Sequence, residues 1–367
     1  MHHGKNGDQV ELNSMTIQIG NHAVGVDQRP FIIAEMSGNH GGSIERAFEI
    51  IDMAAEAGAQ MVKLQTYTAD TMTLDVDRDE FQINDPKSLW YGRSLYELYE
   101  EAHTPWDWHA PIFERARERG ILCFSTPFDL TAVEFLLTFD VPCFKIASFE
   151  NIDLPLIRAV ASTGKPLIIS TGIATFEEVD EAVEAAREVG CTDLVLLKCT
   201  SAYPARPEDI HLNTLSVMRE RWGCQVGLSD HTLGLGTAVA AVALGATVIE
   251  KHVTMDRSDG GVDSAFSLEP QELADLVTAS DAARRSLGAV HLGPSELEMG
   301  ALLRRRSLYF AEDIAAGELL TSTNVRSIRP GLGLPPKHYE DLLGCTALGD
   351  IDRGTPTSWD LVRRSEG

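Results

Sequence analysis

The chain has 367 residues, 44% of them apolar, and it carries 55 acidic against 31 basic residues. The resulting net charge of −24 argues against a nucleic-acid or anionic-membrane partner, because both need a basic surface. No apolar stretch approaches the ~18 residues of a membrane span and the amino terminus lacks an apolar signal core, so we expect a cytoplasmic protein.

Short apolar runs recur along the chain, and each ends in polar or charged residues. In chain order they are residues 31–35, 61–66, 121–126, 143–148, 166–171, 194–200, 225–231 and 248–253. The stretches between these runs have helical periodicity, so strand and helix alternate eight times. This order predicts an α/β fold of the (β/α)8 TIM-barrel type, in which the carboxyl ends of the strands carry the active site.

Helix-end signals support the alternation. Ser43 is the expected N-cap of the first barrel helix. Thr104 followed by Pro105 predicts the start of a helix that runs to Gly120. The final barrel helix is expected over residues 269–287.

The connection between the second strand and its helix, residues 67–103, is unusually long and contains Trp90 and several tyrosines. Loops of this length in a compact barrel are usually functional, so a lid or a substrate wall is one interpretation. A structural insertion whose aromatic side chains pack on the barrel is the other.

A barrel needs roughly 250 residues, so the chain has room for a second module. We expect the catalytic barrel over residues 1–290, a linker over 291–305 and a small β-rich module over 306–367, where Gly and Pro become frequent and helical spacing stops. A module of about 60 residues is marginally stable alone, so we expect it to dock on a barrel, its own or a partner's.

The six cysteines show no metal-binding or redox spacing. Three of them lie inside the predicted strands. We therefore interpret them as buried apolar thiols and not as disulfides or nucleophiles.

Lysine is rare, with eight in the chain, yet four lysines interrupt the apolar runs: Lys63, Lys145, Lys198 and Lys251. Burying an ammonium group is costly unless a counter-charge is present, so we expect several of them to meet at the barrel mouth and bind a polyanion. Lys63 and Lys145, with hydroxyls such as Thr126 and Ser148, are candidates to bind phosphate and carboxylate groups. A Schiff-base lysine, as in class I aldolases, is the alternative.

Two histidines follow adjacent strands, His231 after the seventh and His252 at the end of the eighth. Together they could supply two ligands to a divalent metal and leave positions for water and a substrate oxygen. A hydrogen-bonded core histidine is the ordinary alternative for each. Strand side chains two apart share a face, so Ser229 points with His231. Glu35, at the end of the first strand, is a candidate acid or base.

Longer motifs resemble the sialic acid synthase family. They are FIIAEMSGNHGGSIERAFEIIDMAAEAGAQMVKLQT, STPFD, FKIASFE, KPLIISTG, LLKCTSAYP, VGLSDHTLG, ALGATVIEKHV and SIRPGLGLPPK, and they span nearly the whole chain. The resemblance implies condensation of phosphoenolpyruvate with an acetamido-deoxy hexose to a nine-carbon 2-keto sugar acid. It also implies a carboxyl-terminal antifreeze-like (SAF) domain and a place in nonulosonic acid and surface-glycan biosynthesis.

Within the family, TYTADTMTL, SLYELYEEAHTPWDWH and KCTSAYPA are most similar to the pseudaminic acid synthase branch. That branch joins 2,4-diacetamido-2,4,6-trideoxy-altropyranose to phosphoenolpyruvate and releases pseudaminic acid and phosphate. Ser201 stands where sialic acid synthases often have Asn, which fits a changed sugar pocket. N-acetylneuraminic and legionaminic acid synthases are the alternatives.

The resemblance implies roles for single residues. His231 and His252 would bind the metal, usually manganese. Phosphoenolpyruvate would be held by Lys63, Thr126, Lys145, Ser148 and Ser229. The sugar and its aldehyde would contact Glu35, Gln65, Ser201, Tyr203 and Asp263. Glu35 or Glu150 would position or deprotonate the attacking water. Arg329 would enter the partner subunit's site in a domain-swapped homodimer.

Two other functions are compatible with parts of the sequence. A lysine-dependent aldolase would leave the paired histidines and the second module without a role. A non-catalytic carbohydrate-binding protein would be expected to lose polar strand ends, whereas Glu35, Lys63, Lys145, His231 and His252 are all present.

Overall fold

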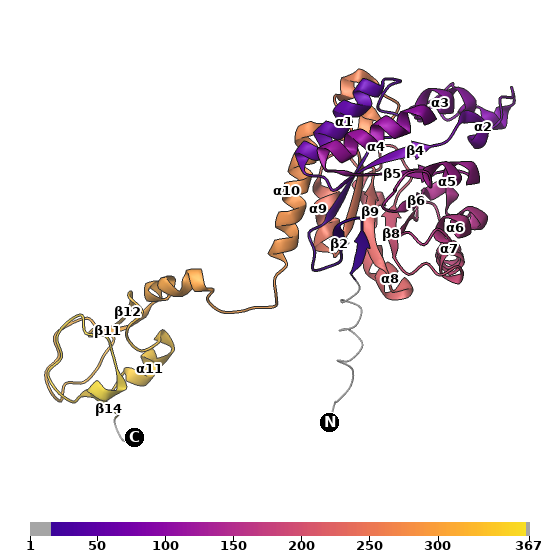
Figure 1. Ribbon diagram of the computed structural model, residues 1–367. Coiled ribbons are helices and arrows are strands. Elements are labelled where there is room, and N and C mark those ends of the chain that lie inside the picture. The colour runs from indigo at the N-terminus through magenta and orange to yellow at the C-terminus, as the bar shows by residue number, and fades with distance from the viewer. Residues whose placement is uncertain (1–15, 365–367) are drawn as a thin grey trace. The chain divides into compact units, whose positions relative to one another are not determined.

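The computed structural model describes residues 16–364 (Figure 1). The chain divides into two compact units, one ending at Gly288 and the other beginning at Ala289. All six cysteines are buried free thiols, as the sequence predicts. Within residues 16–364, no helix has the length and apolar character needed to cross a bilayer.

The first unit is built on a parallel sheet whose strands coincide with the eight apolar runs. The strands are β3 (Phe31–Glu35), β4 (Met61–Thr66), β5 (Leu122–Pro127), β6 (Phe144–Ile146), β7 (Leu167–Ser170), β8 (Leu194–Cys199), β9 (Gln225–Asp230) and β10 (Val248–His252). Their order is β5-β4-β3-β10-β9-β8-β7-β6, and β5 contacts β6, which closes the sheet into the predicted (β/α)8 barrel.

A short hairpin fills the amino-terminal end of the barrel. Strands β1 (Ile17–Ile19) and β2 (His22–Val24) pair antiparallel. Their apolar side chains form one buried cluster with Phe31, Ile33 and other strand residues. Polar side chains at the opposite, carboxyl ends of the strands therefore face the open end of the barrel.

Eight helices alternate with the strands and surround them (Figure 1). They are α1 (Ile44–Ala57), α4 (His109–Arg119), α5 (Leu130–Leu136), α6 (Leu154–Ala161), α7 (Phe176–Glu188), α8 (Thr214–Trp222), α9 (Gly236–Ala243) and α10 (Pro270–Ser286). The main apolar core lies between these helices and the outer face of the strands. Ser43 caps α1 as predicted, because its hydroxyl accepts a hydrogen bond from the Arg46 N–H.

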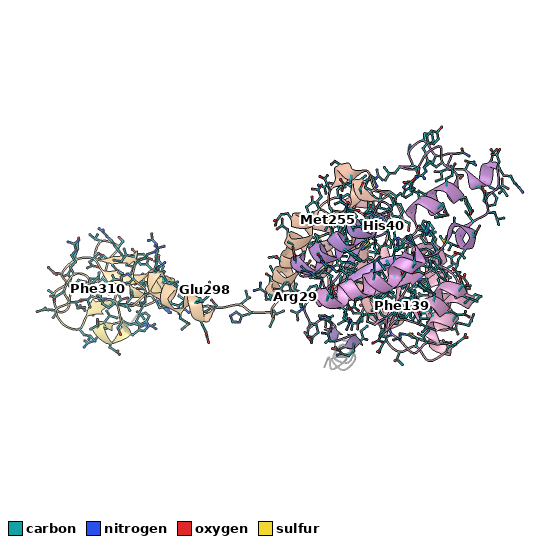
Figure 2. The ribbon with its side chains drawn as sticks, turned by 45° about the horizontal axis from the view of Figure 1, so that its top comes forward. Arg29, His40, Phe139, Met255, Glu298 and Phe310 are labelled. Carbon is teal, nitrogen blue, oxygen red and sulfur yellow. The ribbon has the colours of Figure 1, made fainter. Side chains whose placement is uncertain are left out.

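The predicted start of the helix before β5 is wrong. A 3₁₀ turn, η3 (Trp106–Trp108), precedes α4, which begins at His109 and ends at Arg119, with Gly120 as the expected C-terminal cap. The Thr104 hydroxyl lies 3.2 Å from Nε2 of His40, a residue labelled in Figure 2, and does not cap a helix. A tertiary contact therefore replaces the local cap that the sequence indicates.

The long connection after β4 has its own structure. It contains α2 (Ala69–Met72), η2 (Asp79–Phe81) and α3 (Leu95–Ala102), and α2 and α3 lie side by side (Figure 1). We call residues 67–103 the insertion. Other short 3₁₀ helices of this unit are η4 (Ser148–Glu150), η5 (Pro207–Asp209), η6 (Arg257–Asp259) and η7 (Ser264–Phe266).

The second unit is small and has short strands, as predicted. Its elements are η8 (Glu296–Arg304), β11 (Ser307–Phe310), β12 (Val325–Ile328), η9 (Pro336–His338), α11 (Tyr339–Leu342), β13 (Thr346–Ala347), η10 (Trp359–Leu361) and β14 (Val362–Arg363). Strands β11 and β12 pair antiparallel, as do β13 and β14. The unit has its own apolar core, which includes Leu308 and Phe310 (Figure 2).

Candidate active site

A cavity of about 520 Å³ opens at the carboxyl ends of the barrel strands. Most of the residues that the sequence analysis selects line it. They are Lys63, Gln65, Lys145, Ser148, Glu150, Tyr203, Ser229, His231, His252 and Asp263. The barrel therefore brings together side chains that lie as much as 200 residues apart in the sequence.

A buried ion cluster forms the floor of this cavity. Lys63 Nζ lies 2.8 Å from Glu250 Oε1 and 3.1 Å from Glu35 Oε2, and none of these side chains is more than 5% exposed. Burial alone would lower the pKa of Lys63, but the charges of Glu250 and Glu35 outweigh it and raise that pKa. Lys63 is therefore positively charged at neutral pH.

Glu250 is the main counter-charge of the floor. Burial would raise its pKa, but Lys145 and Lys63 hold it at about 2. Glu250 Oε1 also accepts a hydrogen bond of 3.3 Å from Ser229. Glu250 was not among the site residues selected from the sequence. It lies two residues before His252 and therefore shares a face of β10 with it, which is the pattern that could have predicted its place in the site.

Lys145 lies beside this cluster, 4.0 Å from Glu250 Oε1. Its ammonium donates to Ser170 Oγ at 2.7 Å and to the Ile146 carbonyl at 3.0 Å. Burial lowers the pKa of Lys145 to about 8. Two ammonium groups, Lys63 and Lys145, thus face the cavity together with the Ser148 and Ser229 hydroxyls, which is the composition of an anion-binding site.

The other two strand lysines do not reach the cavity, so the prediction of convergence is wrong for them. Lys251 is fully buried on the opposite face of β10, where its ammonium lies 2.8 Å from Asp230 Oδ2. Lys198 donates to the Cys199 carbonyl at 2.8 Å. Alternation along a strand sends neighbouring residues to opposite faces, which separates Lys251 from Glu250 and His252.

The two histidines meet as predicted, with ring centroids 5.3 Å apart. His231 Nδ1 lies 3.0 Å from the Thr200 carbonyl and donates a hydrogen bond to it, which orients the ring. Burial, and then the charge of His231, lower the pKa of His252 far below its usual value, so this ring is neutral.

The neutral ring of His252 can bind a divalent metal. Burial would lower the pKa of His231, but the charge of Cys199 and a hydrogen bond to it raise that pKa, so a metal would have to displace a proton from His231. His252 Nδ1 is buried and has no hydrogen-bond partner within residues 16–364; the nearest carboxylate oxygen, Oδ2 of Asp263, lies 3.5 Å away. The same part of the chain contains no group of three or more His, Cys, Asp or Glu side chains arranged to hold a metal. The observation that fits a metal is the unpartnered Nδ1 atom of His252 beside His231, and these two imidazoles are the side chains that would hold it.

A polar network that the sequence analysis missed holds Asp263 at the cavity. The Ser37 hydroxyl donates to Asp263 Oδ2, and the Asp263 N–H donates to Asn39 Oδ1 at 3.1 Å. Asn39 Nδ2 in turn donates to the Val253 carbonyl at 2.9 Å. The SGNHGG motif after β3 therefore holds the loop that follows β10 through hydrogen bonds. The polar residues of this motif are the feature of the sequence from which the network could have been predicted.

Several selected residues of the barrel unit do not line the cavity. Glu35 is buried behind it, where Gln65 Nε2 donates to Glu35 Oε1 at 2.8 Å. Thr126 is buried, and its hydroxyl has no partner within residues 16–364. Ser201 Oγ lies 4.0 Å from Cys199 Sγ, and Arg329 is exposed on the second unit.

Glu150 does face the cavity. Its Oε2 atom is buried without a hydrogen-bond partner in the described part of the chain. Burial raises the pKa of Glu150 to about 7, so the carboxyl group can accept or release a proton at neutral pH. Of the two carboxylates considered for the water, Glu150 is the one that lines the cavity.

The insertion forms one wall of the cavity through Met72, Ile83, Trp90, Leu95 and Leu98. Trp90 Nε1 donates to the Val262 carbonyl at 3.0 Å, and the Trp90 ring lies 5.8 Å from the Tyr203 ring. The insertion is therefore part of the site, and its aromatic residue joins it to the loops after β8 and β10.

Comparison with known proteins identifies relatives of both units. Residues 50–291 match the NeuB family and residues 305–363 match the SAF domain. A pseudaminic acid synthase of Campylobacter jejuni is 48% identical over 92% of this chain and 97% of that protein. An N,N'-diacetyllegionaminic acid synthase of Legionella pneumophila is 36% identical over 90% of this chain and 94% of that protein. The crystal structure of an N-acetylneuraminic acid synthetase from Leptospira borgpetersenii has a TM-score of 0.70 and 33% identity over 79% of this chain and 95% of that one.

The ion cluster predicts a pH-dependent stability loss for Lys63→Met. Without the ammonium, Glu35 and Glu250 become neighbouring buried carboxylates, so we expect the free energy of unfolding to fall by about 3–5 kcal/mol at pH 8. Their folded-state pKa values would lie above the unfolded ones, so stability is lost as pH rises and the deficit should be smaller at pH 6. Urea denaturation at both pH values measures it. The exposed Lys87→Met is the control, and an equal deficit at pH 6 and pH 8 would contradict the prediction.

Proposed function

Because this chain belongs to the NeuB family, we propose that it condenses phosphoenolpyruvate with 2,4-diacetamido-2,4,6-trideoxy-altropyranose and water to give pseudaminic acid and phosphate. The observation that carries the proposal is the 48% identity to a pseudaminic acid synthase over nearly the full length of both proteins. It is supported by a barrel cavity that combines a lysine pair, a histidine pair and a carboxyl group with a pKa near neutrality. The enzyme is thus a synthase that forms a carbon–carbon bond.

The floor of the cavity suits phosphoenolpyruvate. Its phosphate and carboxylate need cations and donors, which Lys63, Lys145, Ser148 and Ser229 offer on adjoining strands. A bound dianion would stabilise the charged form of Lys145, whose pKa of about 8 already keeps it largely protonated at neutral pH. Glu35, which is buried behind Lys63, would act by positioning that ammonium and not by touching the substrate.

A divalent metal, for which we propose manganese, would be held by His231 and His252. When bound, it would polarise the aldehyde of the open-chain sugar as a Lewis acid. Asp263, held by Ser37, and Gln65 line the same region and can bind sugar hydroxyls. Tyr203, whose ring lies 4.5 Å from that of His231, shields the reacting carbons from bulk water.

The bond-forming step then has a place for each charge. Carbon 3 of phosphoenolpyruvate attacks the sugar aldehyde, the π electrons of the carbonyl move to its oxygen, which takes up a proton from solvent, and positive charge develops at carbon 2. Water adds to carbon 2 and its proton passes to Glu150. In the resulting tetrahedral intermediate the carbon–oxygen bond to phosphate breaks, the new hydroxyl loses its proton as the keto group forms, and Lys63 and Lys145 stabilise the departing phosphate.

The proposed location is the cytoplasm. Phosphoenolpyruvate is an intracellular metabolite. The six buried free thiols also suit a reducing compartment.

Phosphate release tests the reaction directly. We expect release from phosphoenolpyruvate with manganese and the diacetamido-trideoxy-altrose sugar, with kcat/KM at least ~10-fold above that for the legionaminic precursor or N-acetylmannosamine. EDTA should stop the release and added manganese should restore it. Preference for another sugar would change the assigned product. Chelator-resistant turnover with borohydride trapping of a lysine would favour the aldolase instead.

The role of Glu150 predicts a pH limb in kcat. Because the base must be ionised, kcat should rise as the pH increases through about 7 and then level off. Glu150→Gln should lower kcat by about 10²–10⁴-fold and remove this limb. Glu35→Gln is the matched comparison and should keep the limb. If Glu35→Gln removes it and Glu150→Gln does not, the water is handled by Glu35.

We also propose a domain-swapped homodimer in which Arg329 enters the partner's cavity. Exposed apolar residues follow several strands at the carboxyl ends of the barrel: Leu130, Ile152, Ile173 and Leu233, each more than 50% exposed. A surface of this kind favours coverage by a partner. Arg329 itself is exposed on the small unit and would supply a further cation for the substrate anion.

Subunit complementation tests this arrangement. Co-expressed His252→Ala and Arg329→Ala chains with different tags yield heterodimers that can be purified on both tags. In a swapped dimer, one site receives an intact barrel and an intact Arg329, so we expect activity to return to about half of the wild-type level by site counting. Heterodimers no more active than the parent variants would show that Arg329 acts within its own chain or not at all.

A further inference from the structure

The cavity is chemically divided into a charged floor and an apolar wall. The floor carries Lys63, Lys145 and Glu250 together with the two histidines. The insertion supplies the wall, whose apolar part consists of Met72, Ile83, Trp90, Leu95 and Leu98 and is called the apolar wall. The insertion also places the polar side chains of Tyr67, Asp85, Ser88 and Tyr99 at the cavity. None of the steps of the proposed reaction uses this wall.

The backbone of the insertion holds the apolar wall in place. The Ile83 N–H donates to the Arg93 carbonyl and the Gly92 N–H donates to the Ile83 carbonyl, both at 2.9 Å. Leu95 begins α3 directly after a capping box made by Ser94 and Glu97. Because backbone and cap bonds set its shape, the wall is arranged before a substrate arrives, which reduces the entropic cost of binding.

The position of the wall shows which part of a substrate meets it. Phosphoenolpyruvate consists mainly of charged groups and belongs on the floor. The sugar aldehyde belongs at the histidine pair. The centroids of the His231 and Tyr203 rings are 4.5 Å apart, and those of the Tyr203 and Trp90 rings are 5.8 Å apart. The Tyr203 ring therefore lies between the histidine pair and Trp90, where the wall begins. The wall therefore meets the end of the sugar chain that is distant from the aldehyde.

We propose that the apolar wall determines sugar specificity by binding the methyl groups of a 6-deoxy, 4-acetamido sugar. This inference rests on the proposed function and deepens it. A sugar with a hydroxyl at carbon 6 or carbon 4 would place that hydroxyl against Ile83, Leu95 or Leu98, where the apolar side chains offer it no hydrogen bond. Discrimination of this kind is about 10–200-fold per group. The wall selects substituents and not configuration, so the expected preference for the altro over the manno diacetamido-trideoxy sugar must come from the polar groups of the cavity.

The test uses sugars that bind but cannot react. Borohydride reduction gives open-chain alditols without an aldehyde, and the matched pair is 2,4-diacetamido-2,4,6-trideoxy-altritol and its 6-hydroxy counterpart. Titration calorimetry with the full chain, phosphoenolpyruvate and manganese gives the Kd of each. The wall variant is I83T/L95Q, which keeps the backbone bonds of the insertion. The control is V76T/L89Q, which introduces the same two side chains at exposed positions of the insertion that do not line the cavity.

We expect wild-type protein and the control to bind the 6-deoxy alditol at least ~10-fold more tightly than the 6-hydroxy one, and I83T/L95Q to lose that ratio while its Kd for phosphoenolpyruvate stays unchanged. Equal wild-type affinity for both alditols, no binding of either, or a similar loss in the control would overturn the inference. Phosphate release with the reactive sugars decides the proposed function separately, so each proposal can fail while the other stands.

Discussion

The buried ion cluster of Lys63, Glu35 and Glu250 is the constraint on which the site depends. Three adjacent strands, β4, β3 and β10, each contribute one of these charges, and the parallel register places Glu35 beside Lys63. A lone ammonium in a barrel interior would lose its proton or destabilise the fold. Because two carboxylates surround it, Lys63 remains charged in a place that water scarcely reaches, and the barrel can offer a cation to a phosphorylated substrate.

The cluster also organises its neighbours. Glu250 brings Lys145 and Ser229 toward the same floor, so the anion-binding groups share one counter-charge. Above this floor, the loop after β3 fastens the loop after β10 through Asn39 and holds Asp263 next to His252. The charged part of the site is therefore held in place by hydrogen bonds between loops that are distant in the sequence.

The remaining part of the site follows a different principle. The insertion adds apolar side chains from outside the barrel repeat, so it can change the sugar that binds without disturbing the ion cluster. In the proposed function the charges of the floor serve carbon–carbon bond formation, whereas in the further inference the wall selects the substituents of the sugar. One barrel can then serve several related sugars, in agreement with the range of sugar acids that relatives with 33–48% identity are named for.

The sequence by itself determined the barrel, its strands and most of the cavity residues, because strands buried on both faces read as continuous apolar runs and their polar ends point to one edge. Tertiary structure decided which polar residues matter. Lys63 and Lys251 each interrupt an apolar run in the sequence, but the face of the strand places the Lys63 ammonium at the cavity and pairs the Lys251 ammonium with Asp230. Packing likewise placed Glu150 at the cavity and Glu35 behind it. These positions depend on contacts between neighbouring strands, and the local sequence pattern does not encode such contacts.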